Sequence, residues 1–151
     1  MKSHAPKNYV CPICLAVEGI ENDQTLIKQQ DILYKDEDVM VFISSFFIEG
    51  AEGQPLISPI RHYENFYDIP DTLGAKIFKI SKEYAVKMKN AYNCDGVNIL
   101  QNNEPAAGQH AFHYHLHLFP RYEGKDIWPK MGRKKLASME ERLEFVKKFK
   151  Q

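Results

Sequence analysis

The alternation of apolar and polar residues divides the chain into short strands and a long helix. DILYKDEDVMVFIS (31–44) predicts two strands around the polar turn Lys35–Asp38, GQPLISPI (Gly53–Ile60) a third, and GVNILQ (96–101) a fourth. The clearest helix spans Asp71–Tyr92, with lysines opposite an apolar face. That face consists of Leu73, Ile77, Ile80, Tyr84, Met88 and Ala91.

The remaining pattern predicts one more strand and a second helix. AFHYHLHLFPR (111–121) alternates with a period of two, as a strand does. Ser138 and Glu141 have the spacing of a capping box, and an apolar face formed by Leu143, Val146 and Phe149 follows them. Strands in runs around one long helix indicate an α+β fold with an antiparallel sheet, and not a βαβ array.

Composition narrows the function classes. The 151 residues are 44% hydrophobic with a formal net charge of zero, which is typical of a globular protein and excludes bulk electrostatic binding of nucleic acid. From Arg121 onward ten Lys and Arg face five Asp and Glu. A solvated basic tail explains this excess most simply, and attraction of phosphate near a site is the alternative. No apolar run approaches the ~20 residues of a membrane span, and the N-terminus has no apolar signal core, so we expect a cytoplasmic protein.

Three histidines share one face of the strand predicted at 111–121. Alternate side chains point to the same side, so His113, His115 and His117 project together at intervals of about 7 Å. Imidazole can act as a nucleophile, a base, an acid or a zinc ligand. A solvent-facing strand would use threonine, lysine or glutamate as readily, so repeated histidine favours chemistry. The interleaved residues, Phe112, Tyr114, Leu116 and Leu118, are expected in the core.

The segment NNEPAAGQHAF, residues 102–112, supplies polar groups immediately before the histidines. It carries the side-chain amides of Asn102, Asn103 and Gln109, and Gly108 allows a close approach of the backbone. Amide donors next to a strand that has no acidic residues suit an anionic ligand such as phosphate. Ordinary turn chemistry is the alternative for the two asparagines.

The motif CPIC places Cys11 and Cys14 at the spacing of half a zinc site. A redox pair would need a thioredoxin-like context that the pattern lacks, and a pair of buried thiols without metal is the remaining alternative. Cys94 stands alone, so two further zinc ligands would be histidines, with His62 and one of the three strand histidines as candidates. A competing hypothesis puts all three strand histidines on one catalytic metal, and the cysteine pair counts against it.

HYHLHLF resembles the His-φ-His-φ-His-φ-φ signature of the histidine triad (HIT) family, in which φ is apolar. The resemblance extends over three ordered blocks: CPIC followed by ILYKDEDVMVFI, then PLISPIRHYENFYDI, then GVNILQNNEPAAGQHAFHYHLHLFPRYEG. These blocks are similar to the zinc-containing branch with a CxxC pair. We therefore expect a single HIT domain over 1–151, with a core at about 11–128 and a basic, helical C-terminal tail at about 129–151.

The resemblance implies a five-stranded antiparallel sheet with one long helix and short terminal helices, paired into a homodimer with a ten-stranded sheet. It implies hydrolysis or nucleotidyl transfer at an α-phosphate, on nucleoside phosphoramidates, dinucleoside polyphosphates or similar conjugates. The nucleophile would be His115, which forms a nucleotidyl intermediate. His117 would contact the phosphate and protonate the leaving group.

The same resemblance assigns the remaining site residues. Asn102 and Gln109 match positions that hold phosphate oxygens in the family. One structural zinc per chain would be held by Cys11, Cys14, His62 and His113.

Two positions depart from the family pattern. His110 stands where a hydroxyl residue usually contacts phosphate, and Ser44 stands where an acidic residue usually holds the ribose. Phe42 could still form an apolar base slot together with Pro12, Ile13 and Ala16. These departures motivate the alternative that the chain is a nucleotide-binding regulatory protein with little or no turnover.

Overall fold

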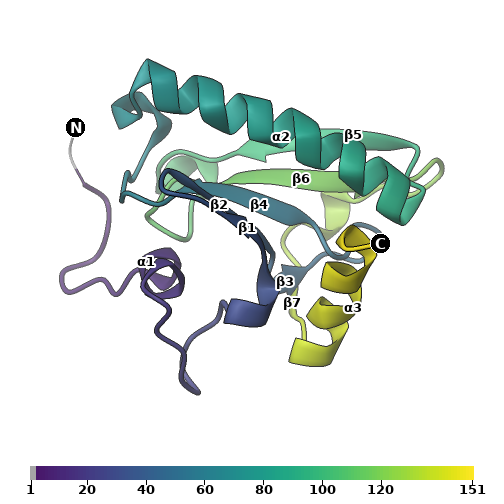
Figure 1. The fold of residues 1–151 in the computed structure, drawn as a ribbon, viewed down its shortest axis with the longest axis horizontal. Coiled ribbons are helices and arrows are strands. Elements are labelled where there is room, and N and C mark those ends of the chain that lie inside the picture. The colour runs from purple at the N-terminus through teal and green to yellow at the C-terminus, as the bar shows by residue number, and fades with distance from the viewer. Residues whose placement is uncertain (1–2) are drawn as a thin grey trace.

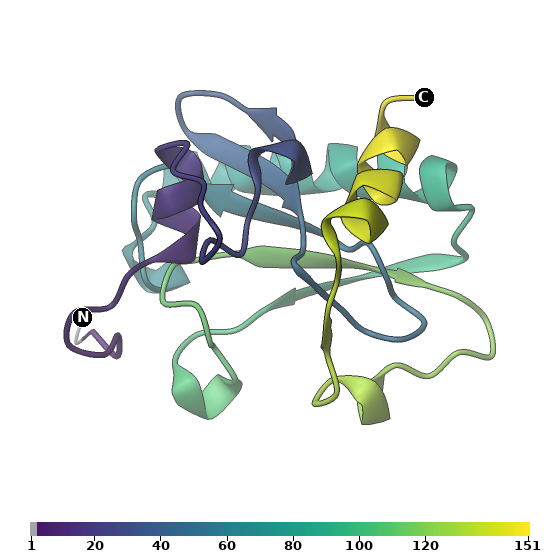
Figure 2. The ribbon, with the colours of Figure 1, turned by 90° about the horizontal axis from the view of Figure 1, so that it is seen from below.

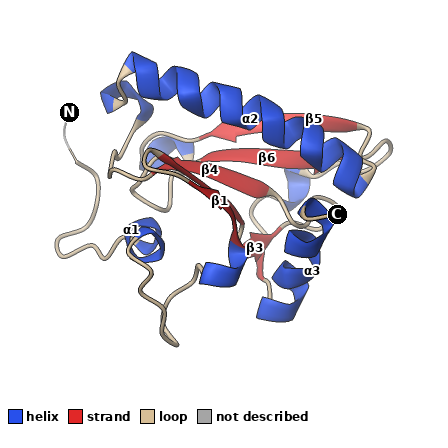
Figure 3. Ribbon diagram, viewed as in Figure 1, coloured by secondary structure: helices blue, strands red, loops and turns tan. Residues whose placement is uncertain are grey.

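The structure of the protein is a computed structural model, and it describes residues 3–151. Five antiparallel strands form the main sheet in the order β1-β2-β4-β6-β5, and β3 pairs with β7 in a small second sheet (Figure 3). The helices are α1 Pro12–Val17, α2 Asp71–Tyr92 and α3 Met139–Phe149, with 3₁₀ turns at Gln29–Asp31, Phe66–Asp68, Pro105–Ala107 and Trp128–Lys130. The strands are β1 Ile32–Lys35, β2 Val39–Ile43, β3 Phe46–Phe47, β4 Pro55–Pro59, β5 Gly96–Gln101, β6 Leu116–Arg121 and β7 Lys135–Leu136.

The long helix α2 covers one face of the sheet (Figure 1). Its apolar stripe packs on the alternate residues of β2, β4 and β6 that point toward it, which follows from the two periodicities of helix and strand. Asn93 ends the helix in the left-handed conformation, with φ of 50°. The resulting core contains Val39, Val41, Ile57, Ile77, Ile80, Tyr84, Met88, Tyr114, Leu116 and Leu118.

A second apolar cluster fills the opposite face of the sheet, beneath α1. Pro12 begins this short helix at a position where proline needs no backbone partner, and the Cys11 sulfur accepts a hydrogen bond from the Cys14 amide at 3.3 Å. The cluster comprises Ile13, Ala16, Ile27, Met40, Phe42 and Leu56. Because the sheet is covered on both faces, all residues of β2 and β4 are buried.

The C-terminal segment packs back onto the domain. In the small sheet Phe46 pairs with Leu136 and Phe47 with Lys135, and α3 follows from a capping box between Ser138 and Glu141. Seen from below (Figure 2), α1 and α3 lie at opposite ends of the same side of the sheet.

Most element predictions are confirmed, including the α+β class, the five-stranded antiparallel sheet, the boundaries of α2 and the helix after Ser138. The strand predicted at 111–121 is shorter than expected, because regular pairing begins only at Leu116. Phe112 was expected in the core but packs edge-on against Tyr9, with ring centroids 5.4 Å apart. Among residues 3–151, no helix combines the length and apolar character that a membrane crossing requires.

Candidate functional site

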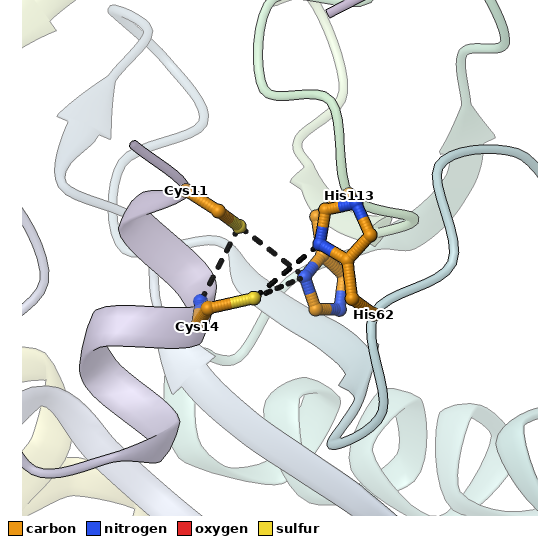
Figure 4. A group of neighbouring side chains, drawn as sticks. All are labelled: Cys11, Cys14, His62 and His113. Carbon is orange, nitrogen blue, oxygen red and sulfur yellow. Dashed lines mark hydrogen bonds between the residues drawn. The ribbon is translucent and has the colours of Figure 1, made fainter. Parts of the chain in front are cut away.

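Two cysteines and two histidines converge at one end of the sheet. Cys11, Cys14, His62 and His113 each offer one ligand atom, and these atoms lie within 4.8 Å of one another (Figure 4). The Cys11 sulfur lies 3.3 Å from Nδ1 of His113, and the Cys14 sulfur lies 3.3 Å from Nδ1 of His62 and 3.5 Å from that of His113. Tetrahedral zinc with ordinary bond lengths separates sulfur and nitrogen ligands by about 3.5 Å. The donor types and their separations therefore fit a tetrahedral zinc ion.

The fold explains why residues so distant in sequence meet. Cys11 and Cys14 begin α1, His62 follows the end of β4, and His113 precedes β6. Strands β4 and β6 are neighbours, with Ile57 opposite Leu116, so their adjacent ends bring the two imidazoles together. The rings of His62 and His113 stack edge-on with centroids 4.8 Å apart.

Hydrogen bonding and burial prepare His113 to act as a ligand. Its side chain is fully buried, and its Nε2–H donates to the Pro59 carbonyl oxygen at 3.0 Å, which leaves Nδ1 with a free lone pair toward the sulfurs. Burial lowers the pKa of His113 to about 4, so the ring is neutral at physiological pH. A neutral imidazole with a fixed tautomer is the form that binds a metal.

The Cys14 thiol needs a nearby positive charge to ionise at neutral pH. Burial, together with the adjacent Cys11, raises the pKa of the Cys14 thiol to about 12. A divalent cation stabilises the thiolate and reverses that shift. Cys14 is therefore suited to binding a metal and unsuited to acting as a reactive thiol.

His115 is the second member of the triad and is not one of the four cluster residues. Its Nδ1–H donates to the backbone oxygen of His113 at 2.7 Å, and its side chain lines a large cavity. Burial lowers the pKa of His115, and the charge of Lys134 lowers it further, against the opposing effect of the bond to His113. The imidazole is therefore neutral, with the lone pair of Nε2 available.

His117 lies beside His115 on the same cavity. The two ring centroids are 5.0 Å apart, and the ring of His117 stacks on Phe119 at 5.3 Å with an interplanar angle of 13°. Burial lowers the pKa of His117 well below its ordinary value, with further contributions from His115 and Lys134. Its Nδ1 is buried and has no hydrogen-bond partner among the described residues.

The cavity beside these two histidines has a volume of about 1120 Å³. The sheet forms its floor, the segment that follows α1 forms one wall, and residues 131–134 form another. It is large enough for a nucleotide-sized ligand. The apolar part of its lining includes Pro12, Ile13, Phe42 and Leu56. Ala16, which belongs to α1, is fully buried and does not line the cavity.

Four of the five predicted substrate-binding residues line the cavity: Phe42, Ser44, Asn102 and His110. Gln109 does not line it. Its Oε1 accepts a hydrogen bond from the Glu104 backbone amide, and its Nε2 donates to the Glu64 backbone oxygen, both at 2.7 Å. The side chain therefore holds the preceding loop in place. A phosphate contact by Gln109 stays a prediction. The substrate-binding roles of the other four residues also stay predictions, although all four line the cavity.

The Ser44 hydroxyl is already engaged by its own turn. Its Oγ donates to the Phe46 oxygen at 2.9 Å and accepts from the Phe46 amide at 3.2 Å. Gly108 lines the cavity with φ of +83°, a left-handed conformation that favours glycine.

Lys134 is a cavity residue that the sequence pattern did not single out. The basic excess after Arg121 was the only signal of it, because that excess could indicate phosphate binding near a site. Ten basic residues share the segment, however, and nothing in their spacing distinguishes the one that reaches the cavity.

Comparison with known proteins adds to this geometry. The sequence matches the HIT domain family over residues 26–124. It is 34% identical to an uncharacterized HIT-like protein of Methanocaldococcus jannaschii over 116 residues, which are 77% of this chain and 88% of that protein. It is 40% identical to the adenosine 5'-monophosphoramidase HNT1 of Saccharomyces cerevisiae over 75 residues, which are 50% of this chain and 45% of the yeast protein. A Zn-bound histidine triad family protein from Mycobacterium smegmatis has the same fold, with a TM-score of 0.73 at 23% identity, covering 93% of this chain and 94% of that one.

Proposed function

Because this chain belongs to the HIT family, we propose that it is a nucleotide hydrolase or nucleotidyl transferase that acts at an α-phosphate through a nucleotidyl-His115 intermediate. The substrate class is that of nucleoside phosphoramidates, dinucleoside polyphosphates or similar conjugates. Similarity to the yeast monophosphoramidase supports this class.

One observation carries the proposal: the hydrogen bond from Nδ1–H of His115 to the backbone of His113. It commits one nitrogen to the protein and leaves Nε2 as a neutral nucleophile. Asn102 and His110 line the same cavity and offer polar groups to a phosphate. A nucleophile, an anion-binding lining and an apolar slot at Phe42 together suit attack on the phosphorus of a bound nucleotide.

In the first step the Nε2 lone pair of His115 forms a bond to the α-phosphorus, and the bond from phosphorus to the leaving group breaks. The leaving atom keeps that electron pair, and an amine leaving group also takes up a proton, which His117 would supply. In the second step the oxygen of water bonds to phosphorus, the electron pair of the phosphorus–nitrogen bond returns to Nε2, and the water proton passes to solvent. One difficult displacement thereby becomes two easier ones. His117, beside His115, would contact the phosphate in both steps.

We also propose that Cys11, Cys14, His62 and His113 hold one structural zinc. A metal with four protein ligands supplies no open position for substrate, so its contribution is to hold the start of α1 against the segment before β6. The protein is further proposed to form a homodimer, which analytical ultracentrifugation tests directly.

A substrate panel tests the enzymatic proposal. Wild type and His115→Ala are incubated side by side with adenosine phosphoramidate, diadenosine triphosphate and diadenosine tetraphosphate, and released nucleotide is quantified. We expect release by wild type from at least one substrate and none above background from the variant. Release from no substrate by wild type would contradict the proposal, and equal release by both proteins would exclude His115 as the nucleophile.

The second candidate is a nucleotide-binding regulatory protein without turnover. The bonds of the Ser44 hydroxyl to the Phe46 backbone favour it, because they occupy the group that stands at the ribose position of the family pattern. It predicts calorimetric binding of AMP that persists in His115→Ala, with no hydrolysis by either protein.

A further inference from the structure

The cavity beside His115 and His117 contains one permanent charge. None of its lining residues in the described part of the chain is Asp or Glu, and Lys134 is its only Lys or Arg. A single cation in a cavity without carboxylates favours an anionic group of the ligand close to it.

Pairing of β7 with β3 sets the position of Lys134. Lys134 comes immediately before β7, and the Ala137 amide donates to the Ser45 oxygen at 2.9 Å beyond the other end of the strand. The ammonium lies 5.1 Å from the ring centroid of Phe46, which also lines the cavity. Such a cation–π contact stabilises a lysine side chain in one direction without neutralising its charge.

Helix α3 fixes the wall behind this lysine. The guanidinium of Arg142 contacts the Asp31 carboxylate at 2.6 Å, donates to the Leu26 oxygen at 2.8 Å and donates to the Ser45 hydroxyl at 3.2 Å. Leu26 and Ser45 both line the cavity. The buried Arg142 side chain therefore holds both Ser45, which bonds the end of β7, and Leu26 on the opposite wall of the cavity.

Lys134 has no carboxylate partner among the described residues, unlike Lys130 and Lys135. Lys135 pairs with Glu141 at 3.1 Å, and Lys130 pairs with Glu49 at 2.8 Å. None of the ion pairs within residues 3–151 includes Lys134. The match to the HIT domain ends at residue 124, so this cation lies outside the matched segment.

Building on the proposed function, we propose that Lys134 binds an anionic leaving group, so that the chain prefers nucleotides with a further phosphate chain over nucleotides with an amine on the α-phosphate. The preferred class would be nucleoside and dinucleoside polyphosphates. Lys134 shares the cavity with His115 and His117, so its charge lies in the same cavity as the proposed nucleophile.

The chemistry of the two leaving groups is consistent with this preference. When His115 attacks a polyphosphate, the phosphorus–oxygen bond breaks and the electron pair stays on the leaving oxygen, whose negative charge Lys134 balances without a proton transfer. An amine leaving group must instead acquire a proton. His117 rarely carries a proton to donate near neutral pH, because burial lowers its pKa well below the ordinary value.

Kinetics with two substrates test the proposal. The ratio of kcat/KM for diadenosine triphosphate to kcat/KM for adenosine phosphoramidate is measured for wild type, Lys134→Met, Lys134→Arg and Lys135→Met. We expect Lys134→Met to lower the ratio by about 10- to 100-fold, as for the loss of one charged hydrogen bond, and Lys134→Arg to restore most of it. Lys135→Met removes the same charge one residue away from the cavity and should leave the ratio within about twofold. An unchanged ratio in Lys134→Met would overturn the proposal.

A binding measurement separates this proposal from the proposed function. Calorimetry with ATP and AMP reports on Lys134 whether or not the protein turns over any substrate. Lys134→Met should weaken ATP binding more than AMP binding, by about tenfold or more. Equal weakening of both, or of neither, counts against a leaving-group contact even if wild type hydrolyses every substrate. Selective weakening of ATP without any turnover would retain the contact and reject the enzymatic proposal.

Discussion

The Nδ1 atom of His115 lies 2.7 Å from the backbone oxygen of His113, whose own Nδ1 lies 3.3 Å from the Cys11 sulfur. One residue therefore serves the candidate metal cluster with its ring and the proposed nucleophile with its backbone. The position of the carbonyl oxygen depends on the ring being held, so the integrity of the cluster and the orientation of His115 are coupled.

Metal removal should lower both the stability of the fold and the nucleotidyl transfer activity. At a zinc concentration about a thousand times above Kd, bound metal stabilises the fold by about 4 kcal/mol, which corresponds to about 8–16 °C in Tm for a chain of this length. We expect a chelator to lower Tm by that order in a thermal scan, and to lower nucleotidyl transfer in parallel. In Cys14→Ala the chelator should have no further effect. A chelator-resistant Tm in wild type, with no metal detected by elemental analysis, would rule out the zinc assignment.

The lowered pKa of His115 predicts an extended plateau of activity on the acid side. A group with a depressed pKa stays neutral somewhat below its ordinary value of 6.5, so the nucleophile loses its lone pair only when the pH falls below that value. Single-turnover formation of the nucleotidyl intermediate should be constant from pH 8 to 6.5 and decline only at lower pH. A decline centred at or above pH 6.5 would show that burial does not control this imidazole.

The buried pair between Arg142 and Asp31 should contribute strongly to stability. Both side chains are almost fully buried, and Arg142→Met would leave the Asp31 carboxylate without its cation, at a cost of about 3–5 kcal/mol near pH 7. Burial already raises the pKa of Asp31, and loss of Arg142 would raise it further. The variant should therefore regain part of the lost stability as the pH falls and the carboxyl takes up a proton. Urea unfolding at pH 7 and pH 5 measures both effects.

Lys135→Met is the control for that experiment, because it breaks an exposed ion pair between β7 and the same helix, α3. Its cost should not exceed about 1 kcal/mol. If Arg142→Met lowers the free energy of unfolding by as little as Lys135→Met does, water replaces the guanidinium beside Asp31.

Alanine variants of Asn102 and Gln109 should differ in effect, the first lowering kcat/KM and the second lowering stability. Asn102 lines the cavity, so Asn102→Ala should lower kcat/KM by about 100-fold, as for the loss of one donor to a developing anion, with little effect on Tm. Gln109→Ala removes two buried hydrogen bonds and should cost about 1–3 kcal/mol of stability. If Gln109→Ala lowers kcat/KM at an unchanged Tm, its side chain turns toward the phosphate when ligand binds.

Local patterns predicted the regular elements of this fold well. The periodicity of 71–92 identified α2 with both ends, since the helix follows Pro70 and stops at Asn93 in the left-handed conformation. The Ser138–Glu141 spacing identified the start of α3. These features are visible in sequence because each depends on residues within one or two helical turns.

Long-range pairing was the part that local patterns missed. Strands β3 and β7 have two residues each and are separated by most of the chain, so neither shows a period. The position of Lys134 depends on that pairing, and α1, Pro12–Val17, is too short for a helical pattern. The family resemblance named the four cluster residues, and only the packing of α1 against the ends of β4 and β6 brings them together.

Identification of the covalent intermediate tests the central claim most directly. Wild type is mixed with adenosine phosphoramidate or diadenosine triphosphate, quenched within one turnover and mapped by tandem mass spectrometry, with His115→Ala as the control. The account predicts an adenylyl group on His115 in wild type, unmodified His113 and His117, and no adduct in the variant. An adduct on a different residue, or nucleotide release by wild type without any adduct on quenching, would contradict it.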